Sequence, residues 1–298
     1  MTPPPPEPPP SETDEETATP PGVPEVRSER IDTGDRGAVV LLTVSDPRRR
    51  NAMTAALADQ LVSAVSTASD DPGVHAVVVT GESPAFCAGG DLDELAAAGD
   101  EGEAALHRIY AGFLAVAHCP LPVIAAVDGP AVGAGLNLAL AADVRLAGET
   151  ARFDPGFLRL GVHPGGGMTW MAQRAVGPQA TVAMLLGGAS LDAARAAELG
   201  LVLRVVGDDE GDGDDERDGG GDADRRSAAV TAALRMARTS AKAPRELVVA
   251  TKASIRATAG LAGPGAHDEA VRVELGPQLE SLRSEGFREG LERVRAKR

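Results

Sequence analysis

Short apolar runs rich in β-branched residues recur along the first half of the chain. Their length and composition are typical of strands buried on both faces of a sheet. They predict strands at 38–44, 75–80, 122–127 and 143–146. Between these runs, apolar residues recur at helical spacing, as Leu57, Leu61 and Val65 do in a helix that begins near Thr54. The alternation predicts an α/β fold.

Helical periodicity continues through the rest of the chain and dominates its second half. In the first half, further helices are expected near 91–98, around 103–117 and from about 134. In the second half they are expected at 177–187, 191–198, 227–240, 243–258 and 266–285. We therefore predict an α/β core over 31–207 and a helical C-terminal region over 225–298.

Two segments have a composition that cannot form a core. Residues 1–30 are rich in proline and acids, and 208–224 consist almost wholly of Asp, Glu and Gly, so we expect a disordered tail and a disordered insert. Seven acids and two arginines give the tail a charge of −5, and ten acids and one arginine give the insert −9. Of the total of −15, only −1 remains for the folded body, which can therefore accept an anionic ligand.

Composition argues against several classes of protein. Cys87 and Cys119 are too few for a disulfide framework or a thiolate metal cage, and the insert lacks the ligand spacing of an EF-hand, so no metal is expected. No stretch is long and apolar enough to span a bilayer, and the N-terminus lacks a secretion signal. With 2% aromatic residues and no broad basic patch, a nucleic-acid partner is not expected. These observations favour a cytoplasmic protein.

Two glycine-rich turns each stand between a predicted strand and a predicted helix. One spans 86–92 and the other 129–137. Turns of this kind leave backbone N–H groups unpaired at a helix N-terminus, where the helix dipole also favours negative charge. Two such turns aimed at one point form an oxyanion hole, which stabilises charge developing on a carbonyl oxygen. For each turn by itself, a tight turn that simply needs glycine is the alternative.

Several segments at ordered spacing carry a resemblance to a known family. They are 49–52, 76–81, 85–92, 127–143, 151–153 and 160–170. Together they resemble the enoyl-CoA hydratase/isomerase (crotonase) family over 31–298, apart from the acidic insert. The resemblance implies a crotonase-like spiral of ββα units with a helical C-terminal region, assembled as a homotrimer or a dimer of trimers. It also implies an acyl-CoA substrate that carries its own coenzyme A, no separate cofactor, and an oxyanion hole made by the N–H groups of Gly90 and Ala134.

The chain departs from that family at three acid–base positions. Asn137 and Phe157 stand where hydratases of the family have glutamates, and Gly165 stands where some isomerases have an aspartate. Neither Asn137 nor Phe157 exchanges a proton in the accessible pH range, although acid–base catalysis requires a group that does. Other groups must therefore move protons if the chain is an enzyme.

Three side chains near these positions are candidates for that chemistry. His163 is a candidate because an imidazole can both accept and donate a proton, and by the resemblance it borders the acyl pocket. Alternatively, a backbone hydrogen bond or a subunit interface satisfies it. Asp154 either turns into the pocket or closes a turn before Pro155. Asn137 either orients a water or substrate oxygen, or is an amide on a helix surface.

The resemblance also implies a path for coenzyme A. Its nucleotide and pantetheine parts would pass four residues, Arg50, Asn51, Ala52 and Ala88. The arginines at 48–50 either meet phosphate through charge-assisted hydrogen bonds or form a solvated cluster before a helix. Phe287 matches a phenylalanine that packs on the ligand of a neighbouring subunit, but Gly290 stands where the family usually has a lysine.

Two functions remain open from the sequence. The first is an enzyme, nominally an enoyl-CoA hydratase or isomerase, that stabilises an enolate-type intermediate with atypical acid–base residues. The second is an acyl-CoA-binding protein of the same family that keeps the oxyanion hole without catalysis.

Overall fold

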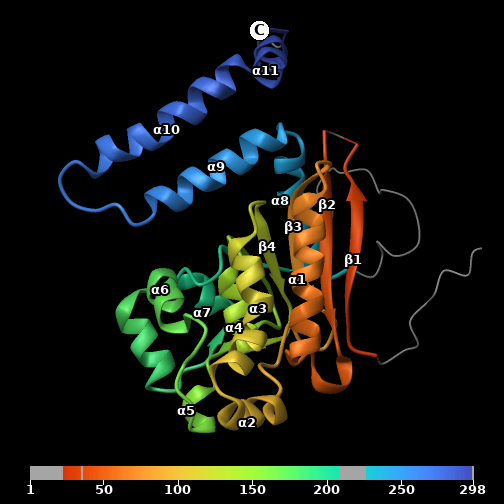
Figure 1. The fold of residues 1–298 in the computed structure, drawn as a ribbon, viewed down its shortest axis with the longest axis vertical. Coiled ribbons are helices and arrows are strands. Elements are labelled where there is room, and N and C mark those ends of the chain that lie inside the picture. Colours follow the sequence, from red (N-terminus) through yellow and green to blue (C-terminus); the bar gives the residue numbers. More distant parts are fainter. Residues whose placement is uncertain (1–22, 35, 208–225, 297–298) are drawn as a thin grey trace, which may run out of the picture.

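The computed structural model of the chain describes residues 23–34, 36–207 and 226–296. A six-stranded sheet forms the centre of the fold, and only its first strand is antiparallel to its neighbour (Figure 1). In spatial order its strands are β1 (Glu25–Asp32), β2 (Ala38–Ser45), β3 (Val74–Gly81), β4 (Val123–Val127), β6 (Val144–Gly148) and β9 (Arg204–Val206). A second, small sheet consists of β5 (Pro130–Val132), β7 (Arg152–Asp154) and β8 (Leu191–Asp192).

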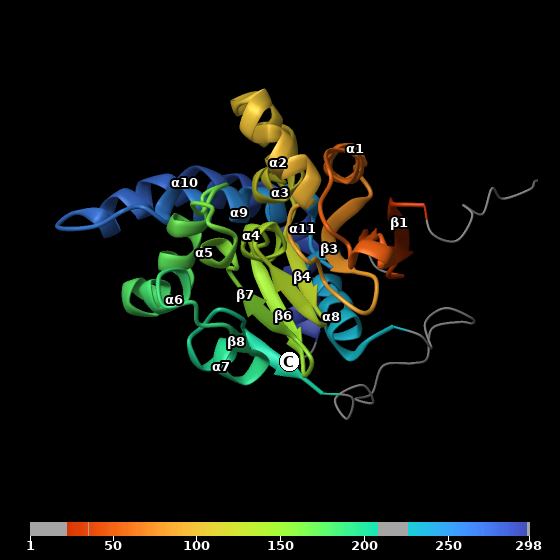
Figure 2. The same ribbon diagram turned by 90° about the horizontal axis from the view of Figure 1, so that it is seen from below.

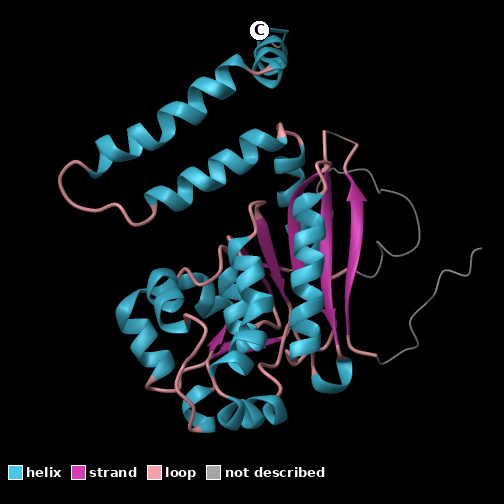
Figure 3. Ribbon diagram, in the orientation of Figure 1, coloured by secondary structure: helices cyan, strands magenta, loops and turns pink. Residues whose placement is uncertain are grey.

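Helices surround both sheets, as Figure 3 shows. Those of the first half are α1 (Ala55–Asp70), α2 (Leu92–Glu101), α3 (Glu103–His118) and α4 (Ala134–Ala141). They are followed by α5 (Phe157–Leu160), α6 (Met168–Leu185) and α7 (Ala193–Glu198). The C-terminal helices are α8 (Ala228–Ala241), α9 (Arg245–Thr258), α10 (Ala266–Arg283) and α11 (Glu285–Ala296).

Both faces of the large sheet are buried, because its inner strands are mostly apolar and even polar residues on them, such as His75 and Thr80, are buried. Strand β2 presents Val40, Leu42 and Val44 to one hydrophobic core and Val39 and Leu41 to another. Helices α1, α3 and α4 pack in the first core, and α8 covers the opposite face (Figure 2). Helix α8 therefore belongs to the α/β layers, although it opens the C-terminal region that the sequence predicts as helical.

The N-terminal boundary differs from the prediction. The sequence predicts a tail over 1–30 and a first strand at 38–44, but β1 begins at Glu25 and pairs along its whole length with β2. Strand β1 lacks the apolar run that would predict a strand, because it is an edge strand whose residues are mostly charged or polar and are exposed or half-buried. The rest of the predicted tail, 1–22, and the whole predicted insert, 208–224, lie outside the described residues.

Other predicted elements are confirmed to within three residues at each end, with one exception. Helix α6 begins at Met168, nine residues before the predicted 177–187, and a non-helical kink at Gly177, followed by Pro178, divides it. The sequence therefore predicts the second half of this helix and not the first half. The small sheet, β9 and α5 are not predicted, because each of these elements is short. Helix α11 has no predicted range of its own, but it lies inside the C-terminal region predicted as helical.

The C-terminal helices extend away from the sheet. Helices α9 and α10 run side by side, and α11 closes the chain at the end opposite α2 and α5 (Figure 1). Lys252 fixes α9 to the core, since its ammonium group donates to the carbonyl oxygen of Leu121 over 2.5 Å and pairs with Asp143. Burial lowers the pKa of Lys252, and the charge of Asp143 opposes that shift. Among the described residues, no helix is long and apolar enough to cross a membrane.

Candidate active site

The two glycine-rich turns lie side by side in parallel register. The Cys87 N–H donates to the carbonyl oxygen of Pro130 over 3.1 Å, and the Val132 N–H donates to that of Cys87 over 2.9 Å. These bonds form an isolated parallel bridge between Cys87 and Ala131. Gly90 and Ala134 each follow their bridge residue by three positions, so the pairing brings the two predicted oxyanion residues to the same level.

Glycines allow the two turns to approach this closely. Gly135 abuts the carbonyl oxygen of Cys87, where any Cβ would overlap that oxygen. Gly89 and Gly133 have φ values of +121° and +50°, which favour glycine. Ala134 is the first residue of α4, so its N–H has no acceptor within the helix. In the described part of the chain, no hydrogen bond engages the N–H of Ala134 or of Gly90.

A cavity of about 410 Å³ opens beside these two N–H groups. Its apolar side chains come from α2, α3 and the segment around α5, and they include Leu95, Ile109 and Leu160. Three polar side chains also line it, those of Tyr110, Asn137 and His163. Among the described residues that line it, none is Asp or Glu. The cavity can therefore hold an apolar ligand next to the two backbone N–H donors.

Asn137 lies inside the cavity wall, where it is 2% exposed. Its Nδ2 donates to the carbonyl oxygens of Gly165 over 3.0 Å and Gly166 over 3.4 Å. Its Oδ1 is buried without a hydrogen-bond partner. Because a carbonyl only accepts, these contacts fix the amide orientation, and the free oxygen is an unused acceptor. Asn137 is therefore not the helix-surface amide of the alternative interpretation.

His163 lines the same cavity and is exposed. Its Nδ1 lies 2.7 Å from the carbonyl oxygen of Pro164, which only accepts, so Nδ1 carries the hydrogen in the neutral ring. The neutral imidazole therefore keeps its basic lone pair on Nε2. One backbone bond thus orients the ring and leaves the other nitrogen available as a base.

Asp154 does not line the cavity. Its Oδ1 accepts from the N–H of Gly156 over 2.9 Å, and its carboxylate forms a two-bond ion pair with Arg159 at 2.7 and 3.1 Å. Hydrogen bonding to Asp154 raises the pKa of Arg159. The structure therefore agrees with the interpretation that Asp154 closes the turn before Pro155, and not with the one in which it turns into the pocket.

The three positions at which the sequence predicts departures from the resembled family all lie at the cavity. Phe157, Asn137 and Gly165 are among its lining residues. Tyr110 lies next to Gly165, and the sequence analysis missed it. Its signal is weak but present, because it is the only tyrosine of the chain and precedes the buried Phe113 by one helical turn.

The residues predicted along the coenzyme A path divide into two groups. Ala88 lines the cavity, and its N–H donates to the carbonyl oxygen of Arg50 over 3.0 Å, so the exposed Arg50 lies at its edge. Ala52 is half-buried beside them. Asn51 is fully buried and donates to the carbonyl oxygens of Glu82 and Ala85 at 2.7 Å each. Its side chain therefore holds the turn together and faces no ligand.

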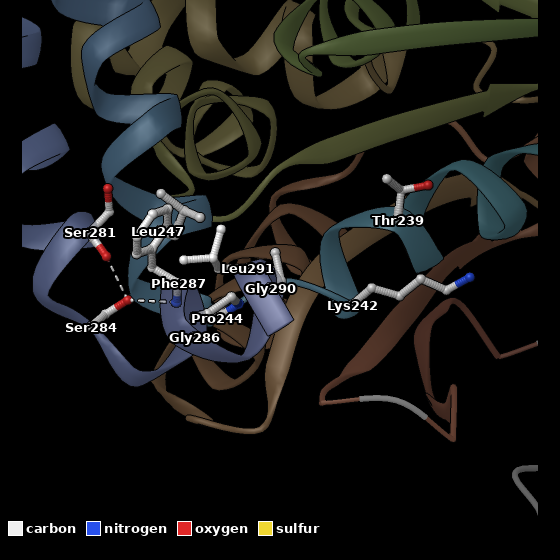
Figure 4. A pocket seen from close by; sticks show the side chains of 11 residues that line it. Thr239, Lys242, Pro244, Leu247, Ser281, Ser284, Gly286, Phe287, Gly290 and Leu291 are labelled. Atoms are coloured by element: carbon white, nitrogen blue, oxygen red, sulfur yellow. Dashed lines mark hydrogen bonds between the residues drawn. The ribbon is translucent and has the colours of Figure 1, made fainter. Parts of the chain in front are cut away.

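Phe287 lies far from this cavity. It belongs to α11 and is 43% exposed beside a second cavity, of about 510 Å³, formed with the end of α8 and the start of α9 (Figure 4). Pro244 and Leu247 from that side face it there. Within one chain, Phe287 therefore does not contact a ligand held by Gly90 and Ala134.

Comparisons with known proteins agree with this geometry. The family model described as enoyl-CoA hydratase/isomerase matches residues 34–214. A Mycobacterium tuberculosis protein named "Probable enoyl-CoA hydratase" is 52% identical over 255 residues, which are 84% of this chain and 91% of the relative. A 2,3-dehydroadipyl-CoA hydratase of Escherichia coli is 40% identical over 175 residues, which are 57% of this chain and 67% of the relative.

Comparison of the fold with solved structures also indicates the enoyl-CoA hydratase family. The crystal structure of an enoyl-CoA hydratase from a Polaromonas species has a TM-score of 0.76 and 28% identity, covering 92% of this chain and 98% of that one. The chain therefore belongs to the enoyl-CoA hydratase/isomerase family and has the crotonase fold. This confirms the family and the fold class expected from the sequence.

Proposed function

We propose that this chain is an enzyme that acts on acyl-CoA thioesters, by hydration or isomerisation of an enoyl-CoA. One observation carries the proposal, namely two unpaired N–H groups, of Gly90 and Ala134, at the mouth of an apolar cavity. A thioester oxygen bound between them gains stabilisation as it takes on negative charge in an enolate. Loss of one such donor typically costs about 2.7–4 kcal/mol of transition-state stabilisation.

We assign the base to His163, because its Nε2 is free and no carboxylate lines the cavity. In hydration of a 2-enoyl-CoA, water forms a bond to Cβ while His163 takes one proton from that water. The C=C electrons form a double bond between Cα and the thioester carbon, and the carbonyl electron pair moves onto the oxygen to give the enolate. When the carbonyl forms again, Cα takes the proton back from the His163 imidazolium, which completes the 3-hydroxyacyl product and restores the neutral ring. This assignment replaces the glutamate pair of the family with one imidazole.

Coenzyme A enters as part of the substrate, so the proposal includes no separate cofactor. Arg50 and Ala88 lie where the polar part of the thioester leaves the cavity, and the guanidinium of Arg50 suits a phosphate. Ala52 flanks the same path, whereas Asn51 supports its backbone.

A second candidate function is binding of acyl-CoA without catalysis, which the carboxylate-free lining favours. Incubation with crotonyl-CoA and longer enoyl-CoAs, with binding and turnover both measured, separates the two. The enzyme proposal expects turnover of at least one of these thioesters. Tight binding of all of them with no turnover would contradict it and support the second function.

We further propose that the protein works as a homotrimer or a dimer of trimers in the cytoplasm. Apolar side chains remain exposed on the C-terminal helices, among them Ile255, Leu275 and Phe287. In such an assembly Phe287 would reach the ligand of a neighbouring copy. The two buried free thiols, Cys87 and Cys119, suit a reducing compartment.

A further inference from the structure

The turn that carries Gly90 is bonded on one side to the segment 49–55, which leads into α1. The Met53 N–H donates to the carbonyl oxygen of Gly89 over 2.7 Å, and the Asp91 N–H donates to that of Met53 over 3.0 Å. These bonds form an isolated parallel bridge between Met53 and Gly90. In a parallel bridge the residue whose two neighbours are bonded points its own N–H away from the partner segment. The Gly90 N–H therefore points to the other side of the turn, where Gly90 lines the cavity.

Asp91 fixes the start of α2 directly after this N–H. Its Oδ1 accepts from the N–H groups of Asp93 and Glu94 at 3.1 Å each, so Asp91 caps the helix. Its Oδ2 lies 3.2 Å from Nη1 of Arg49. The Asp91 side chain is only 12% exposed, whereas that of Arg49 is 56% exposed. One carboxylate thus joins the helix that follows Gly90 to the segment that precedes α1.

A second carboxylate joins the same two helices. The Glu94 Oε2 accepts from the N–H of Ala55 over 2.7 Å, and Ala55 is the first residue of α1. The N-termini of α1 and α2 are therefore held together by side chains, and Gly90 lies directly before Asp91, the cap of α2. Any shift of this helix start would move the Gly90 N–H relative to a thioester oxygen.

We propose that Arg49 and Asp91 are positioning residues, which hold the Gly90 N–H in place for the thioester oxygen. This inference rests on the proposed function. Neither side chain lines the cavity, so both act through the start of α2 and not on the substrate. An oxyanion donor is effective only where it is fixed before the charge develops, and a small displacement lowers the rate. Of the three arginines at 48–50, Arg49 is thereby assigned to the turn and not to a phosphate.

A double-mutant cycle on kcat tests the pair. Arg49→Gln removes one charge, and Asp91→Asn removes the other but keeps an oxygen that can cap the helix. We expect each change to lower kcat about 3- to 10-fold, and the double variant to lower it no further, because all three lose the same contact. Affinity for free coenzyme A, which has no acyl oxygen, should be unchanged.

Two controls separate this effect from a loss of folding. Asp93→Asn removes the same charge from an exposed residue of the first turn of α2 and should leave kcat unchanged. The melting temperature of Arg49→Gln should stay near that of the wild type, because a largely exposed ion pair adds little to stability.

Two kinetic results would contradict the inference. If Arg49→Gln weakens binding of free coenzyme A and leaves kcat unchanged, Arg49 contacts a phosphate and does not position the turn. If the losses of Arg49→Gln and Asp91→Asn multiply in the double variant, the two side chains act separately.

Infrared spectroscopy tests the same pair without turnover. Hydrogen bonds to a carbonyl lower its stretching frequency, so butyryl-CoA labelled with ¹³C at its carbonyl carbon reports on the two N–H donors. We expect the frequency to fall on binding to the wild type and to fall less in Arg49→Gln and Asp91→Asn. An equal fall in all three proteins would show that this inference is wrong, while the proposed function stands. If the frequency of bound butyryl-CoA does not fall in the wild type, the oxyanion hole of the proposed function fails and takes the inference with it.

Discussion

The side-chain amide of Asn137 donates to the carbonyl oxygen of Gly165 over 3.0 Å. These are two of the three positions at which the sequence predicts a departure from the family. Helix α4 is thereby tied to the loop that carries His163, and the amide is committed to donating. Asn137 therefore does not act as an acid or base, because an amide does not exchange a proton in the accessible pH range and its N–H groups already donate to two carbonyl oxygens.

Replacing this amide by a carboxylate should make stability depend on pH. Asn137→Asp keeps the shape of the side chain. It places a carboxyl group, which only accepts hydrogen bonds when ionised, against the two carbonyl oxygens of Gly165 and Gly166. Burial and these acceptors raise the pKa of the new carboxyl above its unfolded value, so the folded state binds the proton more tightly. The loss of stability, about 1–3 kcal/mol, should therefore be complete at alkaline pH and shrink as pH falls through the raised pKa. Denaturant unfolding at pH 8 and pH 5 measures it, and a loss that is equal at both would contradict the geometry.

His163 and Asp154 should differ in their effects on turnover. His163→Gln removes the free Nε2 lone pair, so kcat should fall by about 10²- to 10⁴-fold, the range for a general base. Asp154→Asn should leave kcat within a few-fold, because Asp154 pairs with Arg159 outside the cavity. Steady-state kinetics on the best enoyl-CoA substrate compares the two. A larger effect from Asp154→Asn would reverse the assignment of the base.

The contact between the two glycine turns should be sensitive to a single methyl group. Gly135→Ala sets a Cβ against the carbonyl oxygen of Cys87, a backbone atom that cannot rotate away. We expect a loss of folding stability of about 1–3 kcal/mol, together with weaker acyl-CoA binding. Gly99→Ala is the control, because Gly99 lies in α2 with open space around it and should gain roughly 0.5–1 kcal/mol. Thermal unfolding of both variants is sufficient, and equal behaviour would refute the close approach.

Part of this site can be predicted from sequence patterns, and the residues that cannot be predicted are missed for physical reasons. Strand–turn–helix patterns locate the two glycine turns, because glycine turns and apolar runs are local signals, and the family resemblance selects Gly90 and Ala134 within them. The role of Asp154 depends on Arg159, a partner that only the folded turn brings within 2.7 Å. Tyr110 escapes detection because only the fold brings it next to Gly165, fifty-five residues away in the sequence.

The fold shows the same division between local and distant information. Inner strands such as β3 are mostly apolar and buried almost along their whole length, and β3 is predicted to within one residue. The edge strand β1 is mostly polar, and its pairing with β2 alone makes it a strand. Likewise, the kink at Gly177 interrupts the apolar period of α6 and hides the first half of that helix.

The thiol of Cys87 should be inert in the folded protein. Burial raises its pKa to about 11, against the opposing effect of hydrogen bonds with the backbone of Gly89 and Met53. At pH 8 only about one molecule in a thousand would carry the reactive thiolate. Iodoacetamide labelling followed by mass spectrometry should therefore modify Cys87 in denaturant and leave it unmodified in buffer. Labelling of native protein at the rate of a free cysteine would contradict the burial of this turn.

The central claim is that the N–H groups of Gly90 and Ala134 hold the thioester oxygen, and Ala134→Pro tests it most directly. Ala134 is the first residue of α4, where proline fits a helix well, so this change removes the N–H at little expected cost to the fold. Ala134→Ser keeps the N–H and serves as the control, and circular dichroism checks that both variants fold. With a turned-over enoyl-CoA, kcat should fall about 10²- to 10³-fold in Ala134→Pro and change little in Ala134→Ser. A folded Ala134→Pro variant with the kcat of the wild type would contradict the oxyanion hole.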